Sequence, residues 1–468
     1  MKRVIHERYL TSRIKISALM LASILVLVFP LMTHATSIGT LTVYAGNGTA
    51  GYNGGGVATS YELYRPSGVA VDSTNGILYI ADYAENRIRK VDFATHTLSD
   101  FAGNGTPGHV DNTSPLSAEL YGPFAIAVDP SNGDVYFTET INNDVRKVSF
   151  STGAVTTVAG TGTLGFGGDG GAAISAYLYQ PQGIAVDSSH NVYIADTYNH
   201  RIRVVTASTG NISTIAGNGT CGFYGDGSTA TGAEICTPMG IALDPSGNLY
   251  IADYGNARIR TVTSPLTPGN ITTIAGNGTP GNSLAPPASQ STTYPTTVSI
   301  VALNVAVDGS YNVWIGSGPA ILELSSGTLT RVIGTGTEGF SGIPGAAENA
   351  VFGGGPDGLA IDAAGDVFLA DANNSRVLSV LNGSCLGIYR IAPYGAPVAG
   401  WYEGFTVETS APTSLSVGEG ISITGNSRSD FNNSPWYIDT VVDSTHFTVL
   451  YSVTRGPGTG GCVTLIYP

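Results

Sequence analysis

The sequence predicts an all-β protein whose main domain is a six-bladed β-propeller. Two observations lead to this prediction. A unit of four short strand-like runs recurs along most of the chain, and its clearest copy is PQGIAVDSSHNVYIADTYNHRIRVVTASTGNISTIAGNGT at residues 181–220. Its runs are rich in β-branched residues, are separated by Asp, Asn, Gly and Ser, and show no helical period. Four strands per repeat are typical of one propeller blade.

The number of blades follows from the aspartate that ends each first strand: Asp72, Asp129, Asp187, Asp244, Asp308 and Asp362. Six runs also match the fourth strand, but they are offset by one unit. TLTVYAGNGT precedes every first strand, and the last unit stops after its third strand. We therefore expect Leu41–Ala45 to complete the final blade, because this pairing closes two otherwise open sheet edges.

The string PQGIAVD followed by NVYIADTYNHRIRVV resembles an NHL repeat, and the resemblance extends from about Ile38 to Leu381. The long Gly-rich linkers, such as GTLGFGGDGGAAISAYLYQP, are similar to those of exported bacterial members. The resemblance implies a propeller that serves mainly as a binding platform. RNA-binding members carry a basic face, which this sequence lacks. Amidating-lyase members need several histidines around a central metal, and the sequence shows no such set.

The regions outside the repeats predict export and a second domain. Residues 1–35 hold a basic stretch, the apolar run ISALMLASILVLVFPLM and a small residue, as in a signal peptide. An uncleaved membrane anchor is the alternative. We assign the propeller to residues 36–384 and a small all-β module to residues 385–468, where five strand-like runs resemble modules of bacterial surface and phage-tail-like proteins. The mature protein is expected to be secreted, at the cell surface or periplasmic, with no stable membrane span.

The net charge and the cysteine content limit the partners and the compartment that we expect. The formal net charge of −14 makes nucleic acid an unfavourable partner for the domain as a whole. Four cysteines suit disulfides in an oxidising compartment. The local pairing joins Cys221 to Cys236 and Cys385 to Cys462, although four cysteines allow three connectivities. Because no CxxC spacing occurs, the sequence does not predict a zinc or redox site.

Four units place an aspartate five residues before an arginine. The pairs are Asp82 and Arg87, Asp196 and Arg201, Asp253 and Arg258, and Asp371 and Arg376. We predict that each pair forms a structural ion pair at the turn between the second and third strands. The remaining two units lack the pair, since one has Glu139 and Asp144 and the other has Ser317. The second arginines of the third strands are expected to face solvent on the other side: Arg89, Arg146, Arg203 and Arg260.

The loops between second and third strands share one face of a propeller with the linkers between blades. Their candidate ligand-binding residues are Tyr83, Glu85, Asn142, Tyr198, Asn199, Tyr254, Asn256 and Asn373. Tyrosine rings and amides suit a sugar or an extended peptide, because flat rings give apolar contact and amides give directional hydrogen bonds. The alternative is that the linker tyrosines pack between blades as core.

The sequence shows no catalytic constellation, and we expect no cofactor. Asp169 and Asp226 in the Gly-rich linkers are possible Ca²⁺ ligands, but one carboxylate per linker favours turn formation. The first hypothesis is an exported, non-catalytic binding or scaffold protein with a protein or glycan ligand. The alternative is a calcium-dependent lactonase, esterase-like or lyase enzyme in the propeller channel, with Glu139 and Asn304 near the ion by fold analogy. A purely structural surface element is the third.

Overall fold

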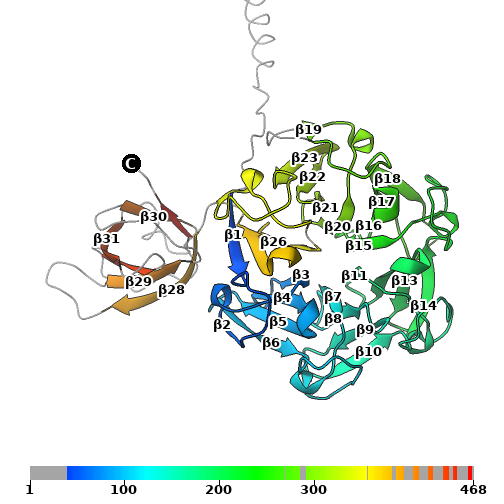
Figure 1. Ribbon diagram of the computed structural model, residues 1–468, viewed down its shortest axis with the longest axis horizontal. Coiled ribbons are helices and arrows are strands. Elements are labelled where there is room, and N and C mark those ends of the chain that lie inside the picture. Colours follow the sequence, from blue (N-terminus) through cyan, green and yellow to red (C-terminus); the bar gives the residue numbers. More distant parts are fainter. Residues whose placement is uncertain are drawn as a thin grey trace, which may run out of the picture. The chain divides into compact units, whose positions relative to one another are not determined.

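The computed structural model describes residues 39–267, 269–284, 291–355 and 357–381, together with the backbone of six strands between residues 386 and 465. Its main domain is an all-β, six-bladed propeller, as predicted (Figure 1). The described residues form strands and single turns of 3₁₀ helix, with no α-helix among them. The predicted signal peptide and the predicted Cys385–Cys462 bond lie outside the described residues.

The first three blades follow one another along the chain. Blade I contains β3 (Pro66–Asp72), β4 (Ile77–Asp82), β5 (Arg87–Asp92) and β6 (Thr97–Ala102). Blade II contains β7 (Pro123–Val128), β8 (Val135–Glu139), β9 (Asp144–Val148) and β10 (Val155–Ala159). Blade III contains β11 (Ile184–Val186), β12 (Val192–Asp196), β13 (Arg201–Thr206) and β14 (Asn211–Ala216). In each blade the four strands are antiparallel neighbours in chain order.

The last three blades repeat this order, except that the final one is completed from the other end of the propeller. Blade IV contains β15 (Pro238–Leu243), β16 (Leu249–Asp253), β17 (Arg258–Val262) and β18 (Ile271–Ala275). Blade V contains β20 (Ala302–Val307), β21 (Val313–Ser317), β22 (Ile321–Ser325) and β23 (Thr328–Ile333). Blade VI contains β25 (Gly358–Ile361), β26 (Val367–Asp371), β27 (Arg376–Val380) and β1 (Thr40–Ala45). Short linker strands add to the outer edge of blades I, V and VI: β2 (Gly56–Val57), β19 (Ser291–Thr292) and β24 (Gly345–Ala346).

Strand β1 closes the ring, which confirms the prediction that the N-terminal strand completes the last blade. It pairs antiparallel with β27, and Leu41 lies opposite Val380 while Val43 lies opposite Leu378. The innermost strands then contact one another around the whole channel, since β25 packs against β3 just as β3 packs against β7. Closure therefore leaves neither the first nor the last strand of the propeller as an unpaired edge.

The aspartate at the end of each first strand builds the following hairpin turn. Its carboxylate Oδ1 accepts a hydrogen bond from the backbone N–H two residues later, at 3.1 Å for Asp72 and 2.9 Å for Asp187. The same bond occurs at Asp129, Asp244, Asp308 and Asp362. An Asx turn of this kind starts a tight reversal without help from the rest of the fold. This is why the motif recurs in all six units.

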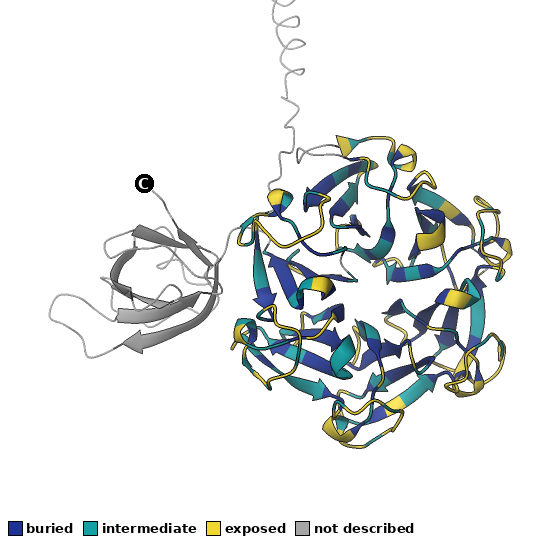
Figure 2. Cartoon of the chain, viewed as in Figure 1, coloured by how far each residue is buried: buried dark blue, intermediate teal, exposed yellow. Residues whose placement is uncertain are grey.

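The hydrophobic core lies between the blades. Each cluster of buried side chains takes residues from two neighbouring blades, as where Ile202 and Val204 of blade III meet Ile241 and Leu249 of blade IV. Corresponding clusters fill the other five junctions. Figure 2 shows the consequence, with buried strands inside the ring and exposed residues gathered in the outer loops. Each blade therefore depends on both neighbours for its burial.

The C-terminal strands form a closed barrel in the order β28-β29-β32-β31-β30-β33. Their bounds are β28 (Leu386–Tyr394), β29 (Gly404–Thr409), β30 (Gly420–Thr424), β31 (Trp436–Val441), β32 (His446–Leu450) and β33 (Cys462–Leu465). Five of the six coincide with runs expected from the sequence. The sixth, β28, lies outside those five runs, and it pairs with both β29 and β33. Among the described residues, no helix has the length and apolar character needed to cross a bilayer.

Candidate functional site

In four blades the loop between the second and third strands is a single turn of 3₁₀ helix. The turns are η2 (Tyr83–Glu85), η5 (Thr197–Asn199), η7 (Tyr254–Asn256) and η10 (Ala372–Asn374). Each ends in a left-handed residue, such as Asn86 with φ 53° and His200 with φ 54°. Backbone hydrogen bonds join the turns to the linkers, as from Ala84 N–H to Tyr64 O at 3.1 Å. The turns and the linkers therefore form one face, which we call the loop face.

The ion pairs of this face differ from the prediction. In three of the four turns the aspartate bonds to the arginine seven residues later, with N···O distances of 3.6 Å for Asp82–Arg89, 3.4 Å for Asp196–Arg203 and 3.0 Å for Asp253–Arg260. Within the described ranges no ion pair joins an aspartate of this set to the arginine five residues later, so the predicted partners Arg87, Arg201, Arg258 and Arg376 were wrong. Asp371 has Leu378 in place of the second arginine and is held by Asn374 and Gly353 N–H.

The second arginines are fully buried, which corrects the expectation that they face solvent. Residues i and i+2 of a strand point to the same side of a sheet, so both arginines lie on the side of the aspartate. Each second guanidinium also reaches a carboxylate outside the turn, at 2.7 Å for Arg89–Asp100, 2.6 Å for Arg203–Asp169 and 2.9 Å for Arg260–Asp226. Asp169 and Asp226, which we considered for Ca²⁺, thus hold a guanidinium in this structure.

The first arginines extend outward instead. Each lies over an aromatic ring of the preceding linker, with Arg201 4.1 Å from the centroid of Phe166 and Arg258 3.7 Å from that of Phe223. Arg87 over Tyr52 and Arg376 over Phe340 repeat the contact. The guanidinium then donates to carbonyls beyond the fourth strand, as from Arg87 Nη1 to Gly103 O at 2.9 Å. This cation–π stack fixes the linker to the blade.

Three of the asparagines that were predicted to bind a ligand also fix a linker to the propeller. The Nδ2 group of Asn199 donates to Gly165 O at 2.6 Å, that of Asn256 to Gly222 O at 2.6 Å, and that of Asn142 to Gly108 O at 2.9 Å. These amides tie linkers to loops. The other candidates are more accessible: Tyr198 and Tyr254 are 45% and 42% exposed, Asn373 is exposed, and Tyr83 and Glu85 are half-buried. The structure thus leaves the tyrosines, Glu85 and Asn373 available for a ligand.

A cavity of about 160 Å³ opens where the loop face meets the mouth of the channel. It is lined by Arg65, Ser67, Tyr83, Phe124, Thr140, Ile141, Gln180, Gln182 and Asp357. Four of these, Ser67, Phe124, Gln182 and Asp357, stand at the same repeat position, immediately before the residue that begins GxAVD in each unit. The remaining two blades have Met239 and Leu303 there. The six innermost strands therefore present six different side chains at the channel mouth.

Opposite charges lie at this cavity. Burial raises the pKa of Asp357 to about 6 from its ordinary 3.8, while the positive charge of Arg65 acts in the other direction. The guanidinium carbon of Arg65 lies 5.4 Å from the centroid of the Tyr83 ring. The backbone carbonyl of Asp357 accepts a 2.7 Å hydrogen bond from Asn304 Nδ2. The cavity thus combines a carboxyl group, a guanidinium, two aromatic rings and amides.

The raised pKa of Asp357 predicts a pH dependence of stability. A carboxyl group whose folded pKa is about 6 favours folding below its unfolded pKa of 3.8, and that contribution is lost as the pH rises through 6. Two pKa units correspond to roughly 3 kcal/mol. The unfolding free energy of the wild type should therefore fall relative to that of Asp357→Asn, by about 2–3 kcal/mol between pH 4 and pH 7. Urea titrations of both proteins at several pH values measure this difference, and parallel curves would contradict it.

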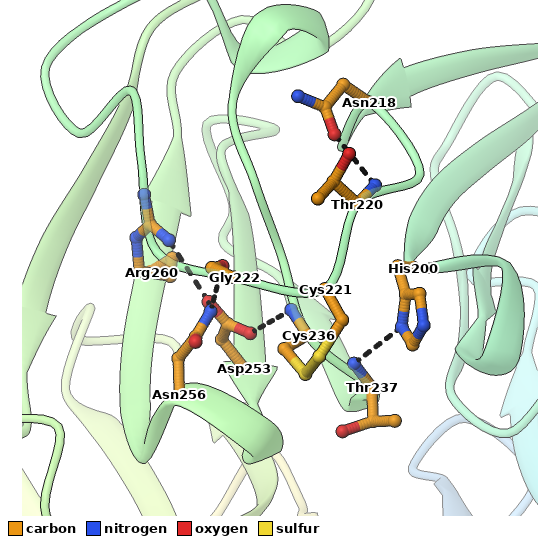
Figure 3. The surroundings of a disulfide bond; sticks show 10 residues. All are labelled: His200, Asn218, Thr220, Cys221, Gly222, Cys236, Thr237, Asp253, Asn256 and Arg260. Carbon is orange, nitrogen blue, oxygen red and sulfur yellow. Dashed lines mark hydrogen bonds and ion pairs between the residues drawn. A yellow bond between two sulfur atoms is a disulfide. The ribbon is translucent and has the colours of Figure 1, made fainter.

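The predicted Cys221–Cys236 disulfide is confirmed and clamps the linker that leads into blade IV (Figure 3). The backbone N–H of Cys236 donates to Asp253 Oδ1 at 2.8 Å, and that of Thr237 donates to His200 Nδ1 at 3.1 Å. The disulfide closes the linker on itself, and these two hydrogen bonds join it to the buried aspartate of its own blade and to the turn of the preceding blade.

Removing this disulfide should loosen the linker without unfolding the propeller. The bond spans 15 residues, for which loop entropy predicts a loss of roughly 3 kcal/mol in the unfolding free energy. We expect Cys221→Ala/Cys236→Ala to show a lower melting temperature than the wild type. Reduction of the wild-type protein with dithiothreitol should lower it by a similar amount. If the double variant and the oxidised wild type have the same melting temperature, the disulfide does not stabilise the protein.

A family profile described as the NHL repeat matches residues 63–91, 178–205 and 236–261, within blades I, III and IV. The propeller contains NHL repeats. Relatives include SUPPRESSOR OF QUENCHING 1 of Arabidopsis thaliana, 29% identical over 47% of this chain and 21% of that protein. Human NHL repeat-containing protein 2 is 30% identical over 37% of this chain and 25% of that protein. The chain thus spans about a quarter or less of either relative.

The NHL propeller also matches solved structures. One from Bacteroides thetaiotaomicron, titled a structural genomics protein of unknown function, has a TM-score of 0.53 and 16% identity. The match covers 73% of this chain and 75% of that one. At this identity the likeness extends to the fold alone.

Blade II of the NHL propeller contains a cluster of ionisable side chains that was not predicted from the sequence. Asp144 stands where four other blades have the first arginine, and His109 stands where their linkers have the stacked ring. His109 Nδ1 lies 2.6 Å from Asp144 Oδ2, and Glu139 bonds to Arg146 at 3.0 Å. Burial, together with the charge of Asp144, raises the pKa of Glu139 to about 8. Aligning the six linkers on Gly-Thr-x-Gly would have placed His109 in register with the aromatic residues.

Proposed function

We propose that this chain is an exported, non-catalytic binding protein that holds a protein or glycan ligand on the loop face of its propeller. The observation that supports this most directly is the channel mouth. The units keep the Asx turn and the β-branched strand residues, yet the position just before GxAVD differs in every blade. A repeat used only as scaffold has no need of six different side chains at one ring position. The Cys221–Cys236 disulfide suits an oxidising compartment.

The chemistry of the cavity suits such a ligand. Tyr83 and Phe124 offer aromatic surface, Gln180 and Gln182 offer amide donors and acceptors, and Asp357 supplies a carboxyl group. Polar groups that converge beside aromatic rings are typical of pockets for small molecules and single side chains. Tyr198 and Tyr254 extend the exposed aromatic surface to blades III and IV. A ligand could therefore place one group in the cavity and lie along the neighbouring turns.

The experiment compares cavity variants with a matched tyrosine outside the cavity. The probes are an array of defined oligosaccharides and a displayed peptide library, each selected on the wild-type protein. Tyr83→Ala and Gln182→Ala should weaken the selected probes at least about tenfold, as expected for loss of one well-packed contact. Tyr311→Ala is the control, because this 51% exposed tyrosine lies in the hairpin between first and second strands of blade V, away from the loop face.

Equal binding by Tyr83→Ala and the wild type would contradict the proposal, and so would an absence of selected probes. Turnover of an aldonolactone or p-nitrophenyl acetate that needs Ca²⁺ and stops with a chelator would favour the calcium-dependent enzyme instead. The two residues considered for that centre make contacts in different places. Glu139 bonds within blade II and its linker, whereas Asn304 of blade V bonds to Asp357 of blade VI.

A further inference from the structure

The charged groups beneath the loop face balance in three blades and not in blade II. Blades I, III and IV each combine two carboxylates with two arginines: Asp82, Asp100, Arg87 and Arg89; Asp169, Asp196, Arg201 and Arg203; Asp226, Asp253, Arg258 and Arg260. In blade II three carboxylates, Asp111, Glu139 and Asp144, accompany the single guanidinium of Arg146. The cluster therefore has three carboxyl groups and one arginine where the other three blades have two of each, and of the three Glu139 and Asp144 are fully buried whereas Asp111 is exposed. Buried charges of this kind need a counter-charge.

The carboxylate that replaces the arginine is incompletely paired. Asp144 is fully buried, and its Oδ1 atom has no hydrogen-bond partner among the described residues. One ligand atom each from His109, Glu139 and Asp144 lies within 4.8 Å of the other two. Imidazole nitrogen and carboxylate oxygens at this spacing can share one cation.

The space that a guanidinium fills elsewhere is open in blade II. A Cβ atom on Gly105 would meet Arg87 Nη2 at 2.6 Å, and one on Gly219 would meet Arg201 Nη2 at 2.5 Å. At the equivalent Gly162 the nearest atom would be Asn142 O at 3.6 Å. A positive group of another kind can therefore occupy this position.

Hydrogen bonds orient His109 for such a role. Thr157 Oγ1 donates to Asp111 Oδ1 at 3.2 Å, so its oxygen can accept from His109 Nε2, which also lies 3.2 Å away. In this structure the 2.6 Å contact is a hydrogen bond in which Nδ1–H donates to Asp144 Oδ2. A cation would displace that proton, so that Nδ1 becomes the ligand while Nε2–H donates to Thr157 Oγ1. Metal-bound histidines usually donate their second ring N–H in this way.

We propose that His109, Asp144 and Glu139 bind a divalent first-row transition metal ion, with Zn²⁺ as the best-fitting example. An imidazole ligand favours such an ion over Ca²⁺ or Mg²⁺, which prefer oxygen. The positive charge of the ion would take the place of the arginine that Asp144 replaces. The ion would join the linker of His109 to the turn between β8 and β9, the connection that the arginine–ring stack makes in four other blades. The His200, Cys221 and Cys236 group does not offer the same chemistry, because its sulfurs form a disulfide.

The test titrates ZnCl₂ into the full chain after treatment with EDTA, using calorimetry and competition with a chromophoric chelator. We expect saturable binding of one zinc at His109, Asp144 and Glu139. Asp144→Asn and His109→Phe should each weaken it at least about 100-fold, since losing a ligand costs more than the 10–100-fold typical of an outer-shell partner. His190→Phe is the matched control. His190 Nδ1 also lies 2.6 Å from a buried carboxylate, Asp129, but the pair belongs to no three-ligand group among the described residues.

A second variant separates ligand loss from misfolding. His109→Phe/Asp144→Arg recreates the stack of blade III, so it should lose zinc binding and keep the melting temperature that the wild type has in EDTA. Unchanged zinc affinity in Asp144→Asn would overturn the proposal. So would an equal loss in His190→Phe, or the absence of saturable binding by the wild type below about 1 mM, where affinity is weaker than about −4 kcal/mol. None of these outcomes depends on the ligand of the loop face.

Discussion

Replacing Leu41 with aspartate is expected to open the propeller ring. Leu41 is fully buried in the core between blades V and VI, in the same cluster as Ile333 and Phe352. It also belongs to β1, the strand that pairs with β27 to complete blade VI. An unpaired charge there costs both the apolar contact and the desolvation of a carboxylate. We expect a loss above about 4 kcal/mol in the unfolding free energy, the range of the most damaging single substitutions.

Urea unfolding followed by circular dichroism measures this loss, and the adjacent residue provides the control. Thr40 belongs to the same strand but is exposed, so Thr40→Asp should change the unfolding free energy by no more than about 0.5 kcal/mol. If both variants unfold at the same urea concentration as the wild type, β1 is not the strand that closes the ring.

The second large effect concerns the buried aspartate of blade III. Asp196 is fully buried and bonds to Arg203, to Asn199 Nδ2 at 2.8 Å and to Tyr179 N–H at 2.8 Å. Asp196→Ala leaves the guanidinium of Arg203 buried with fewer partners. Breaking one side of a buried pair typically costs ~3–5 kcal/mol. We expect a loss of this size in the unfolding free energy.

Double-mutant cycles identify the partner of Asp196. The losses of Asp196→Ala and Arg203→Ala should be coupled by more than about 1 kcal/mol, because the two groups are in contact. Those of Asp196→Ala and Arg201→Ala should add to within about 0.5 kcal/mol, since Arg201 stacks on Phe166 instead. Coupling to Arg201 and none to Arg203 would restore the pairing expected from sequence and refute the one seen in the structure.

The ion pairs show which contacts could not be predicted from the sequence. Spacing placed the aspartate and both arginines around one turn, but the expectation that the second arginine faces solvent ignored the strand period of two. Which guanidinium points inward depends further on a carboxylate in the linker. For Arg203 this group is Asp169, 34 residues earlier in the chain. Local spacing carries no information about such a contact.

The candidate sites also combine features that the sequence predicted with features that only the structure shows. Sequence identified the loop face and its tyrosines, yet it could not show that Asn199 and Asn256 are already bonded to linker carbonyls. It gave no reason to single out His109, because Asp144 lies 35 positions away and comes close only when the linker folds over the blade. The channel cavity likewise combines residues from blades I, II, III and VI.

By itself, the sequence determined the repeat, the number of blades and the closing strand. These depend on strand periodicity, turn-forming aspartates and counting, all of which are local. Only the tertiary structure decided which buried charges meet and which amides are occupied. Those outcomes depend on side chains from separate blades and linkers, and their proximity is created by closure of the ring.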